Sequence, residues 1–409
     1  MGSAALRPVP MAAAEDVLAA RPARIFDLRS PVEFAEDHLP GASNVPLFDD
    51  LERALIGTLY ARSSPAAAFA EGRARTRAKI AALVGEIAAR CGWPAPAGDL
   101  ADRVDGLTEA GIESMERELA PLPAAPGPGS IVFYCWRGGL RSRAMIALLR
   151  GLGHEEVLGI AGGYRAYRAV VRTRIAAWRA PPGVVLRGLT GVGKTLVLRA
   201  LARRRPEWVL DLEALAGHRS SILGMVGLEP ASQKLFDSRL AVRLARGFGR
   251  AVVVEGESRK VGDVVLPEPV WRVIDGGAGL ELVADPARRV RVLLDDYLAS
   301  ATSRAELAQQ LPFIEARLGA RWSGALVELL AQGREAELVE VLLERYYDPL
   351  YRHSEAGRTY RARFDAGDPE AAAAAIERWV ERELDAHRPA RPSCAGSESS
   401  PAPAARAGL

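Results

Sequence analysis

The sequence predicts an α/β protein built from two parallel-sheet units. Two short apolar segments, residues 131–134 and 184–186, each run into a glycine-rich loop that is followed by a helical pattern. A strand, a loop and a helix in this order are typical of parallel sheets, in which helices connect neighbouring strands. The turn-forming residues 181–183, Pro-Pro-Gly, lie between the two motifs and predict a boundary between the units.

Composition limits the possible functions. The 409 residues suffice for two domains, and 49% hydrophobic with 26% charged residues is ordinary for a globular protein. Cys91, Cys135 and Cys394 lie far apart without a CxxC pair, which argues against a disulfide framework or a cysteine-rich zinc site and suits a reducing cytoplasm. The longest uncharged stretch, residues 119–136, contains four prolines and is therefore no membrane span.

The first unit opens with a helical pattern at residues 12–20 and a strand at residues 24–27. Ser30 can cap a helical turn that begins at Pro31. The loop that follows is dense in turn-forming residues and contains His38. His38 is either a catalytic base or a structural hydrogen-bonding group, and its place in a tight loop favours the structural role.

About residues 49–128 form a long insertion that we expect to be mostly helical. Its basic residues Arg73, Arg75, Arg77 and Lys79 stand at every second position. Successive residues of a helix are rotated by about 100°, so these side chains spread around the helix and do not line one face. The insertion is therefore either a lid or substrate-docking element, or a solvated helical pair.

The loop after residues 131–134 reads Cys-Trp-Arg-Gly-Gly-Leu-Arg and precedes a helix at residues 142–150. A helix N-terminus and nearby arginines favour the nucleophilic thiolate form of a cysteine and bind anions. The alternative is a buried structural cysteine, which does not need two glycines and two arginines close by. The predicted catalytic residues are Cys135, Arg137 and Arg141.

Positive charge is concentrated in one segment. Residues 137–206 contain fifteen Lys or Arg and two acidic residues, a net charge of +13, whereas the whole chain carries +3. The segment includes a short strand at residues 156–158 and a basic helix from Gly162 to about Trp178. A basic stripe predicts a site for a polyanion, and a scattered, solvated surface is the alternative.

Residues 188–195 form a complete phosphate-binding loop, G-x4-G-K-T, between the strand 184–186 and a helix at residues 195–201. Backbone N–H groups of such a loop hold a diphosphate, the lysine adds a charge, and the threonine hydroxyl binds Mg²⁺. The predicted binding residues here are Gly188, Thr190, Gly191, Gly193, Lys194 and Thr195, with Thr195 as the metal ligand.

Further strands at residues 208–211, 251–255 and 279–283 predict a doubly wound domain over residues 183–386. Asp211 and Glu255 stand at strand C-terminal ends, where ligands bind in such sheets. They are predicted to hold Mg²⁺ or a catalytic water, and ordinary loop carboxylates are the alternative. Residues 387–409 are rich in Pro, Ala and Ser and are predicted to be a disordered tail.

Two resemblances follow from these motifs. Residues 27–44, Asp-Leu-Arg-Ser-Pro-x-Glu-Phe-x-x-Asp-His-x-Pro-Gly-Ala-x-Asn, resemble the opening of a rhodanese domain, and the Cys135 loop resembles its active-site loop. This implies a rhodanese-like fold for residues 12–179 and a cysteine that carries a chalcogen covalently. The C-x5-R spacing from Cys135 to Arg141 is one residue longer than in common single-domain rhodaneses and leaves room for a larger anion.

A rhodanese-like domain followed by a P-loop NTPase-like domain resembles the bacterial tRNA 2-selenouridine synthase family over nearly all of residues 12–385. Besides the two loops, the resemblance rests on short motifs: Gly57-Thr58-x-Tyr60, Gly162-Gly163-Tyr164, Asp211-Leu212-Glu213, His218-Arg219, Ser232-Gln233-Lys234-x-Phe236, Glu255-x-Glu257-Ser258-Arg259 and Tyr347-Asp348-Pro349-x-Tyr351.

The resemblance implies a cytoplasmic transferase that acts on wobble-position 2-thiouridine in tRNA. Geranyl diphosphate would alkylate the sulfur, and selenophosphate would then supply selenium through Cys135. The phosphate-binding loop would hold the prenyl diphosphate with Mg²⁺, and no membrane is involved. Two rivals are a sulfurtransferase fused to an ATP-dependent small-molecule kinase and a non-catalytic RNA-binding module.

Overall fold

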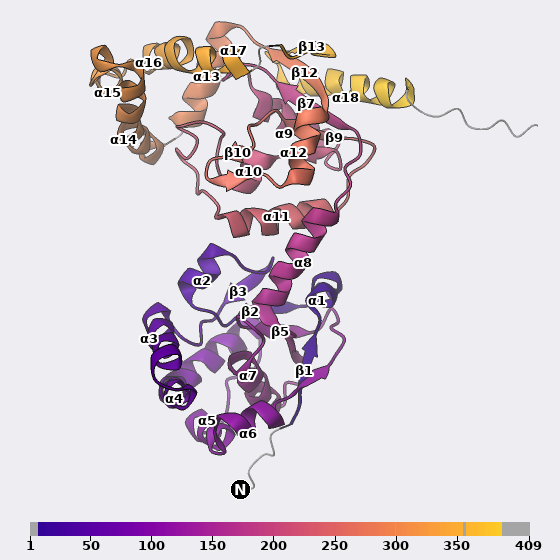
Figure 1. Cartoon of the computed structure of the whole chain (residues 1–409), viewed down its shortest axis with the longest axis vertical. Coiled ribbons are helices and arrows are strands. Elements are labelled where there is room, and N and C mark those ends of the chain that lie inside the picture. The colour runs from indigo at the N-terminus through magenta and orange to yellow at the C-terminus, as the bar shows by residue number, and fades with distance from the viewer. Residues whose placement is uncertain (1–6, 299, 355–356, 387–409) are drawn as a thin grey trace, which may run out of the picture.

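The computed structural model describes residues 7–298, 300–354 and 357–386. Figure 1 shows two lobes, each built on a parallel sheet. The N-terminal lobe comprises residues 7–180 and the C-terminal lobe residues 181–386. The predicted tail, residues 387–409 with Cys394, lies outside the described residues. Among the described helices, none combines the length and apolarity needed to cross a bilayer.

The N-terminal sheet has six parallel strands in the order β3-β2-β5-β6-β1-β4. The strands are β1 (Val9–Ala12), β2 (Arg24–Asp27), β3 (Ala42–Asn44), β4 (Pro121–Pro123), β5 (Ile131–Tyr134) and β6 (Val157–Ile160). β5 and β6 are central and buried at every position, which explains their apolar sequences. The helices of this sheet are α1 (Ala14–Ala20), α2 (Pro31–Glu36), α7 (Leu140–Gly151) and α8 (Gly163–Ala177).

Two strands of this sheet had no clear sequence signal. β1 was not predicted, and the helix expected over residues 12–20 begins only at Ala14, because Ala12 is the last residue of β1. β4 contains two prolines, which lack the N–H group that a central strand needs. It is tolerated because it lies at the edge of the sheet, beside β1 alone.

The insertion is helical, as predicted, and consists of α3 (Asp50–Arg62), α4 (Pro65–Cys91), α5 (Leu100–Thr108) and α6 (Gly111–Glu118). Ser64 caps the start of α4, and Gly92 ends it in the left-handed conformation with φ 71°. The basic residues of α4 are engaged within the insertion. Arg73 and Arg77 pair with Asp105 of α5, whereas Arg75 and Lys79 pair with Glu52 of α3.

The C-terminal sheet has five parallel strands in the order β13-β12-β7-β9-β8. They are β7 (Gly183–Arg187), β8 (Val209–Leu210), β9 (Val252–Glu255), β12 (Ala278–Val283) and β13 (Ala362–Asp365). The helices around it include α9 (Lys194–Arg204), α10 (Leu212–Ala216), α11 (Gln233–Ala245), α12 (Glu268–Gly276), α13 (Pro286–Tyr297) and α18 (Pro369–Ala386). Helices alternate with the strands along the chain, as the sequence predicted; β13 was not anticipated.

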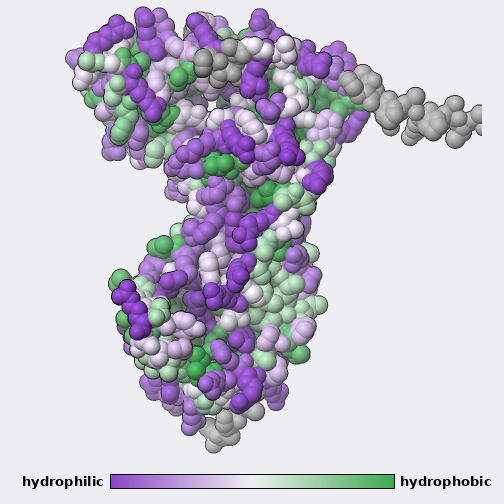
Figure 2. Space-filling view, in the orientation of Figure 1, coloured by the Kyte–Doolittle hydropathy of each residue, from purple (hydrophilic) through white to green (hydrophobic). Residues whose placement is uncertain are grey.

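The lobes meet where α8 packs against α11 (Figure 1). Asp37 lies at the centre of this junction with no exposed surface, and it accepts hydrogen bonds from Tyr164 (2.8 Å), Ser238 (3.0 Å) and Arg168 (3.3 Å). Arg168 also pairs with Asp237 of α11 at 2.8 Å. In Figure 2 the junction is the narrow middle of the molecule.

Candidate active site

Cys135 stands at the C-terminal end of β5, directly before the loop that opens α7. This loop is packed tightly against the start of α8. Gly138 has φ 62°, and a Cβ there would lie 2.5 Å from the carbonyl oxygen of Ile160. A Cβ on Gly163 would lie 2.3 Å from the carbonyl oxygen of Cys135. Glycine at both positions therefore lets the two segments touch and fixes the place of the thiol.

The thiol is 2% exposed and has one polar neighbour. The Sγ atom of Cys135 lies 3.3 Å from the hydroxyl of Ser142, which also donates to the Gly139 carbonyl at 3.2 Å. Arg137 is exposed, Arg141 is half-buried, and neither forms an ion pair with a described residue. Their charges, together with the N-terminus of α7, are therefore available to an anion beside the thiol.

A cavity of about 580 Å³ opens beside Cys135. Cys135, Arg137 and Arg141 all line it, so the structure brings the three predicted residues of this loop together. The opposite wall comes from the helical insertion. The thiol is thus buried from bulk water yet faces a space large enough for a small-molecule substituent.

The phosphate-binding loop has the open backbone expected of it. Gly188, Gly191 and Gly193 have φ of 143°, 78° and 91°, and a Cβ on Gly191 would lie 2.8 Å from the Arg289 carbonyl oxygen. Lys194 donates to the Gly188 carbonyl at 3.1 Å. Burial opposes the charge of Lys194, but nearby Tyr351 and the carboxylates described below hold its pKa above the ordinary value.

Thr190 is also part of this loop. Its hydroxyl oxygen is buried and has no hydrogen-bond partner among the described residues. A buried polar atom without a partner is unfavourable unless a ligand satisfies it. The loop therefore contains a hydrogen-bonding group that the protein itself leaves free.

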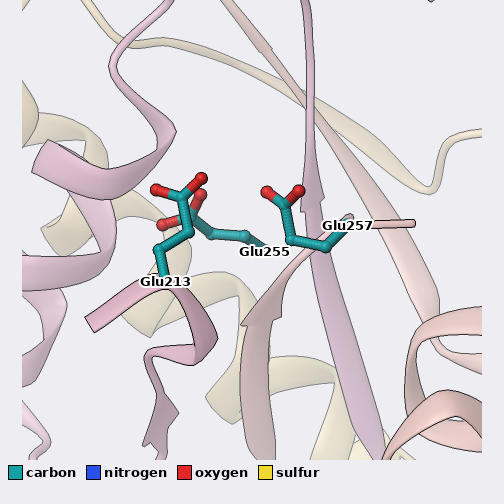
Figure 3. A group of neighbouring side chains, drawn as sticks. All are labelled: Glu213, Glu255 and Glu257. Carbon is teal, nitrogen blue, oxygen red and sulfur yellow. The ribbon is translucent and has the colours of Figure 1, made fainter. Parts of the chain in front are cut away.

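Three carboxylates face the end of this loop. Glu213, Glu255 and Glu257 point toward one another in Figure 3, with oxygen atoms within 4.8 Å. The Thr195 hydroxyl lies 3.2 Å from Glu213 and 3.3 Å from Glu255. Burial and the Glu257 charge raise the pKa of Glu213 to about 7, and burial and Glu213 raise that of Glu255 well above its ordinary range.

Sequence reasoning found only part of this carboxylate group. The Asp211 side chain caps α10, accepting from the Ala214 N–H at 2.8 Å, and the residue that reaches Thr195 is Glu213. Glu213 and Glu257 each stand two positions after an acid at a strand end. That repeated acid-x-acid spacing in the motifs beginning at Asp211 and Glu255 was the available signal.

His38 has the structural role that its loop favoured. Its Nδ1 donates to the Phe34 carbonyl at 2.9 Å, and its ring stacks on that of Phe34 at 4.0 Å. These contacts hold the turn after α2. His38 does not line the Cys135 cavity.

The basic stripe is less continuous than the sequence implied. The last three arginines of the stripe pair with acids of α18: Arg203 with Glu370, Arg204 with Glu377, and Arg205 with Glu377 and Glu381. On α8, by contrast, Arg165 and Arg172 are exposed and form no ion pair within the described part of the chain. Within the stripe, the arginines without an ion pair in the described structure therefore include Arg137 and Arg141 of the Cys135 loop and Arg165 and Arg172 of α8.

Comparison with known proteins identifies the family. Residues 181–383 match the model of the "tRNA 2-selenouridine synthase AAA domain". A tRNA 2-selenouridine synthase of Chromohalobacter salexigens is 30% identical over 397 residues, covering 91% of this chain and 98% of the relative. The chain belongs to the tRNA 2-selenouridine synthase family. The Bordetella bronchiseptica synthase is 32% identical over 375 residues, covering 84% of this chain and 91% of that one.

Membership of the tRNA 2-selenouridine synthase family extends over both lobes. The matched family domain, residues 181–383, contains the phosphate-binding loop and the three carboxylates. The alignment with the Chromohalobacter relative covers 91% of the chain and so includes most of the N-terminal lobe as well. The Chromohalobacter relative thus aligns with sequence from both lobes of this chain.

Proposed function

We propose that this protein is a tRNA 2-selenouridine synthase, a transferase that replaces the sulfur of wobble-position 2-thiouridine with selenium from selenophosphate. One observation carries the proposal beyond family membership. Cys135 lines a cavity at a helix N-terminus beside two arginines that have no acidic partner among the described residues. This arrangement suits a nucleophilic thiol that receives a group from an anionic donor.

The N-terminal lobe, rhodanese-like in its motifs, would carry out the selenium step. Arg137 and Arg141 would bind the selenophosphate anion, and the N–H groups at the start of α7 would add to that attraction. The Cys135 thiolate would attack the phosphorus of selenophosphate, so that an S–P bond forms while the P–Se bond breaks and selenide leaves. Selenide would then add to C2 of the alkylated base, and the C2–S bond would break as geranylthiol departs. Water would hydrolyse the cysteine S-phosphate to phosphate and the free thiol. Ser142, buried beside the sulfur, would orient the thiol through its hydroxyl.

The C-terminal lobe would bind geranyl diphosphate. The sulfur of the thiouridine would attack C1 of the geranyl group while the bond from C1 to the diphosphate oxygen breaks and the diphosphate leaves. Lys194 and the N–H groups of the loop from Gly188 to Thr195 would stabilise the charge of that leaving group. Alkylation turns a poorly departing thione sulfur into one that can leave when selenium arrives.

The carboxylate group fits a divalent cation. One oxygen of Glu255 is buried without a hydrogen-bond partner in the described structure, and three acids lie together beside a threonine hydroxyl. Hard oxygen ligands of this kind suit Mg²⁺. Thr195, Glu213 and Glu255 would hold the ion, which would supply positive charge toward a bound diphosphate.

The substrate tRNA would lie on the exposed arginines of α8, Arg165 and Arg172, of which Arg165 donates its backbone N–H to the Trp136 carbonyl of the Cys135 loop at 3.0 Å. Phosphate contacts from arginine give binding that weakens as salt rises. A tRNA substrate would put the reaction in the cytoplasm, and three separated cysteines without a CxxC pair fit such a reducing compartment.

A nucleotide is the second candidate for the phosphate-binding loop. The acids beside Thr195 are also what an ATP-dependent kinase would place there, so a sulfurtransferase fused to a small-molecule kinase remains a rival. That rival requires ATP turnover without tRNA. Selenium transfer that is independent of ATP and dependent on a prenyl diphosphate supports the synthase.

The decisive experiment incubates the protein with thiolated tRNA, selenophosphate, geranyl diphosphate and Mg²⁺, and then analyses the nucleosides by mass spectrometry. We expect 2-selenouridine, and S-geranyl-2-thiouridine when selenophosphate is omitted. A reaction that yields neither nucleoside would refute the proposal. ATP in place of geranyl diphosphate serves as the test of the rival.

A further inference from the structure

The cavity beside Cys135 is larger and more apolar than a selenophosphate site needs. Selenophosphate is a small, fully polar anion, whereas the cavity has a volume of about 580 Å³. The wall opposite the Cys135 loop is contributed by α3 to α6, which carry apolar side chains into it. Examples of these lining residues are Ile56, Phe69, Ile80, Leu107 and Met115.

The half-buried polar residues of that wall are already satisfied by the protein, and its other polar residues, Arg53, Tyr60 and Glu116, are exposed. Thr76 donates to the Gly72 carbonyl at 2.8 Å, Thr108 donates to the Val104 carbonyl at 2.7 Å, and Arg73 pairs with Asp105. They require no hydrogen bond from a ligand. A molecule that fills this part of the cavity is therefore selected by its apolar surface.

The cavity combines one polar group with a largely apolar lining. Cys135, Arg137 and Arg141 come from one loop, and most of the other lining residues, from α7 and from the helices of the insertion, are apolar. A fitting ligand has a reactive or anionic group joined to a hydrocarbon chain. Water alone is held poorly in such a space because the walls offer it few hydrogen bonds.

We infer that this cavity binds the prenyl chain of the S-alkylated nucleobase, with the sulfur and the adjacent ring carbon placed at Cys135. This inference rests on the proposed function, because it takes the S-geranylated tRNA as the substrate of the selenium step. The prenyl chain lies among α3, α4, α5 and α7, and the ring carbon that bears the sulfur lies beside the thiol. The insertion is thus a substrate-docking element that orients the departing sulfur.

The placement gives the insertion a role in substrate choice. An alkylated thiouridine gains buried apolar surface in the cavity, whereas an unmodified thiouridine leaves that surface exposed to water. The enzyme would thereby transfer selenium to tRNA whose sulfur has already been prepared to leave. The prenyl chain, and not the base, would distinguish the alkylated tRNA from the unmodified tRNA.

A first test needs no variant. Equilibrium dialysis of the full chain against S-geranyl-2-thiouridine and against 2-thiouridine should show binding of the geranylated nucleoside that is tighter by about tenfold or more. Equal affinities would overturn the inference. The same dialysis is done with geranyl diphosphate, in wild type and in the Ala68→Trp variant. It shows whether the cavity binds the prenyl donor or the alkylated base.

A second test fills the cavity. Ala68 is 5% exposed and lines the cavity from α4, whereas Ala70 is exposed on the same helix. Ala68→Trp should slow selenium transfer to pre-formed S-geranylated tRNA, in a single turnover, by about tenfold or more. Ala70→Trp should leave the rate within about twofold of wild type. Circular dichroism and thermal unfolding report whether each variant is folded.

Each outcome decides something. An unchanged rate and unchanged nucleoside binding in folded Ala68→Trp would overturn the inference, and loss of geranyl diphosphate binding alone would reassign the cavity to the donor. If Ala68→Trp does not fold, Ala144→Leu takes its place as the test variant, because it fills the cavity from α7. Failure of the proposed function looks different, because wild type would then form no 2-selenouridine from any thiolated or geranylated tRNA.

Discussion

Gly138 and Gly139 are adjacent in the Cys135 loop, but only the first is fixed by its surroundings. Gly138 has φ 62° and no room for a Cβ, because the Ile160 carbonyl oxygen would lie 2.5 Å away. Gly139 has φ −87°, and nothing lies within 4 Å of a Cβ built there. Of the two adjacent glycines, only Gly138 thus has a steric reason to be glycine.

Gly138→Ala should destabilise the protein by about 2 kcal/mol or more, because it adds left-handed strain and a backbone clash. Gly139→Ala should change the free energy of unfolding by less than about 1 kcal/mol. Chemical denaturation of the two variants beside wild type measures both values. Similar costs at the two positions would contradict this account of the loop.

Glu255 is the most deeply buried of the three carboxylates, at 2% exposed, and one of its oxygens has no partner among the described residues. Three close acids repel one another when no cation is present. The group is therefore arranged for a ligand at the expense of stability, as is common in functional sites.

Glu255→Gln should raise the free energy of unfolding by about 1 kcal/mol without Mg²⁺, because it removes a carboxyl whose ionisation is opposed by burial and by the neighbouring acids. Mg²⁺ should stabilise wild type and have little effect on the variant. Thermal unfolding with and without Mg²⁺ measures both effects, and Glu229→Gln, on an exposed segment, is the control. Equal Mg²⁺ stabilisation of wild type and Glu255→Gln would argue against a cation held by Glu255.

At the scale of elements, the insertion is held together by ion pairs between its helices as well as by an apolar face. Glu52 of α3 accepts from Lys79 and Arg75 of α4 and is only 13% exposed. Burial opposes ionisation of Glu52, but Lys79, the Asp49 N–H and Arg75 outweigh it and hold its pKa below the ordinary value. The basic residues of α4 therefore tie the wall of the cavity together.

The lowered pKa of Glu52 gives a pH dependence with a definite sign. A carboxyl that ionises more readily when folded contributes stability above its ordinary pKa of about 4.5, and that stability is lost as pH falls through the lower folded value. Glu52→Gln should therefore cost about 1 kcal/mol at pH 7 and progressively less toward pH 3. Denaturation at both pH values tests this, with the exposed Glu109→Gln as a control.

At the scale of the whole molecule, the lobes are coupled through a buried charge. Asp37 of the N-terminal lobe and Ser238 and Asp237 of the C-terminal lobe share contacts with Arg168. Tyr164, which donates to Asp37, also packs against Trp136 of the Cys135 loop at 5.3 Å. The thiol loop is therefore one side chain away from the junction.

Asp37→Ala should destabilise the junction by about 3 kcal/mol, because it leaves Arg168 and two hydroxyl groups without their shared acceptor. Asp37→Asn should cost less, because it keeps an acceptor and because burial already raises the pKa of Asp37 toward the neutral form. Calorimetry should show a lower unfolding temperature for the alanine variant, with the two lobes melting separately. Equal effects of the two substitutions would mean that the acceptor is unimportant.

The proposed chemistry divides between the lobes, so single substitutions should separate its steps. Cys135→Ser should abolish selenium incorporation and leave S-geranylation largely intact, since the thiol serves only the second step. Lys194→Ala should slow S-geranylation by about 100-fold. Mass analysis of tRNA nucleosides with and without selenophosphate measures each step. Equal loss of both steps in Cys135→Ser would contradict the division.

Local sequence determined the parts of this protein that depend on neighbours along the chain. The glycine-rich loops, the helical insertion, the central strands and the positions of Cys135 and Lys194 follow from turn chemistry, capping and short apolar runs. These features need no distant partner. They sufficed to place the thiol and the phosphate-binding loop, and they resembled one enzyme family.

Only the tertiary structure decided which distant groups meet. β4 forms because an edge position tolerates its prolines, Glu213 replaces Asp211 beside Thr195, and the α18 acids neutralise the arginines that end α9. The cavity beside Cys135 exists because helices far away in sequence close over the loop. Such contacts depend on the packing of the whole chain, which sets distances that no local pattern encodes.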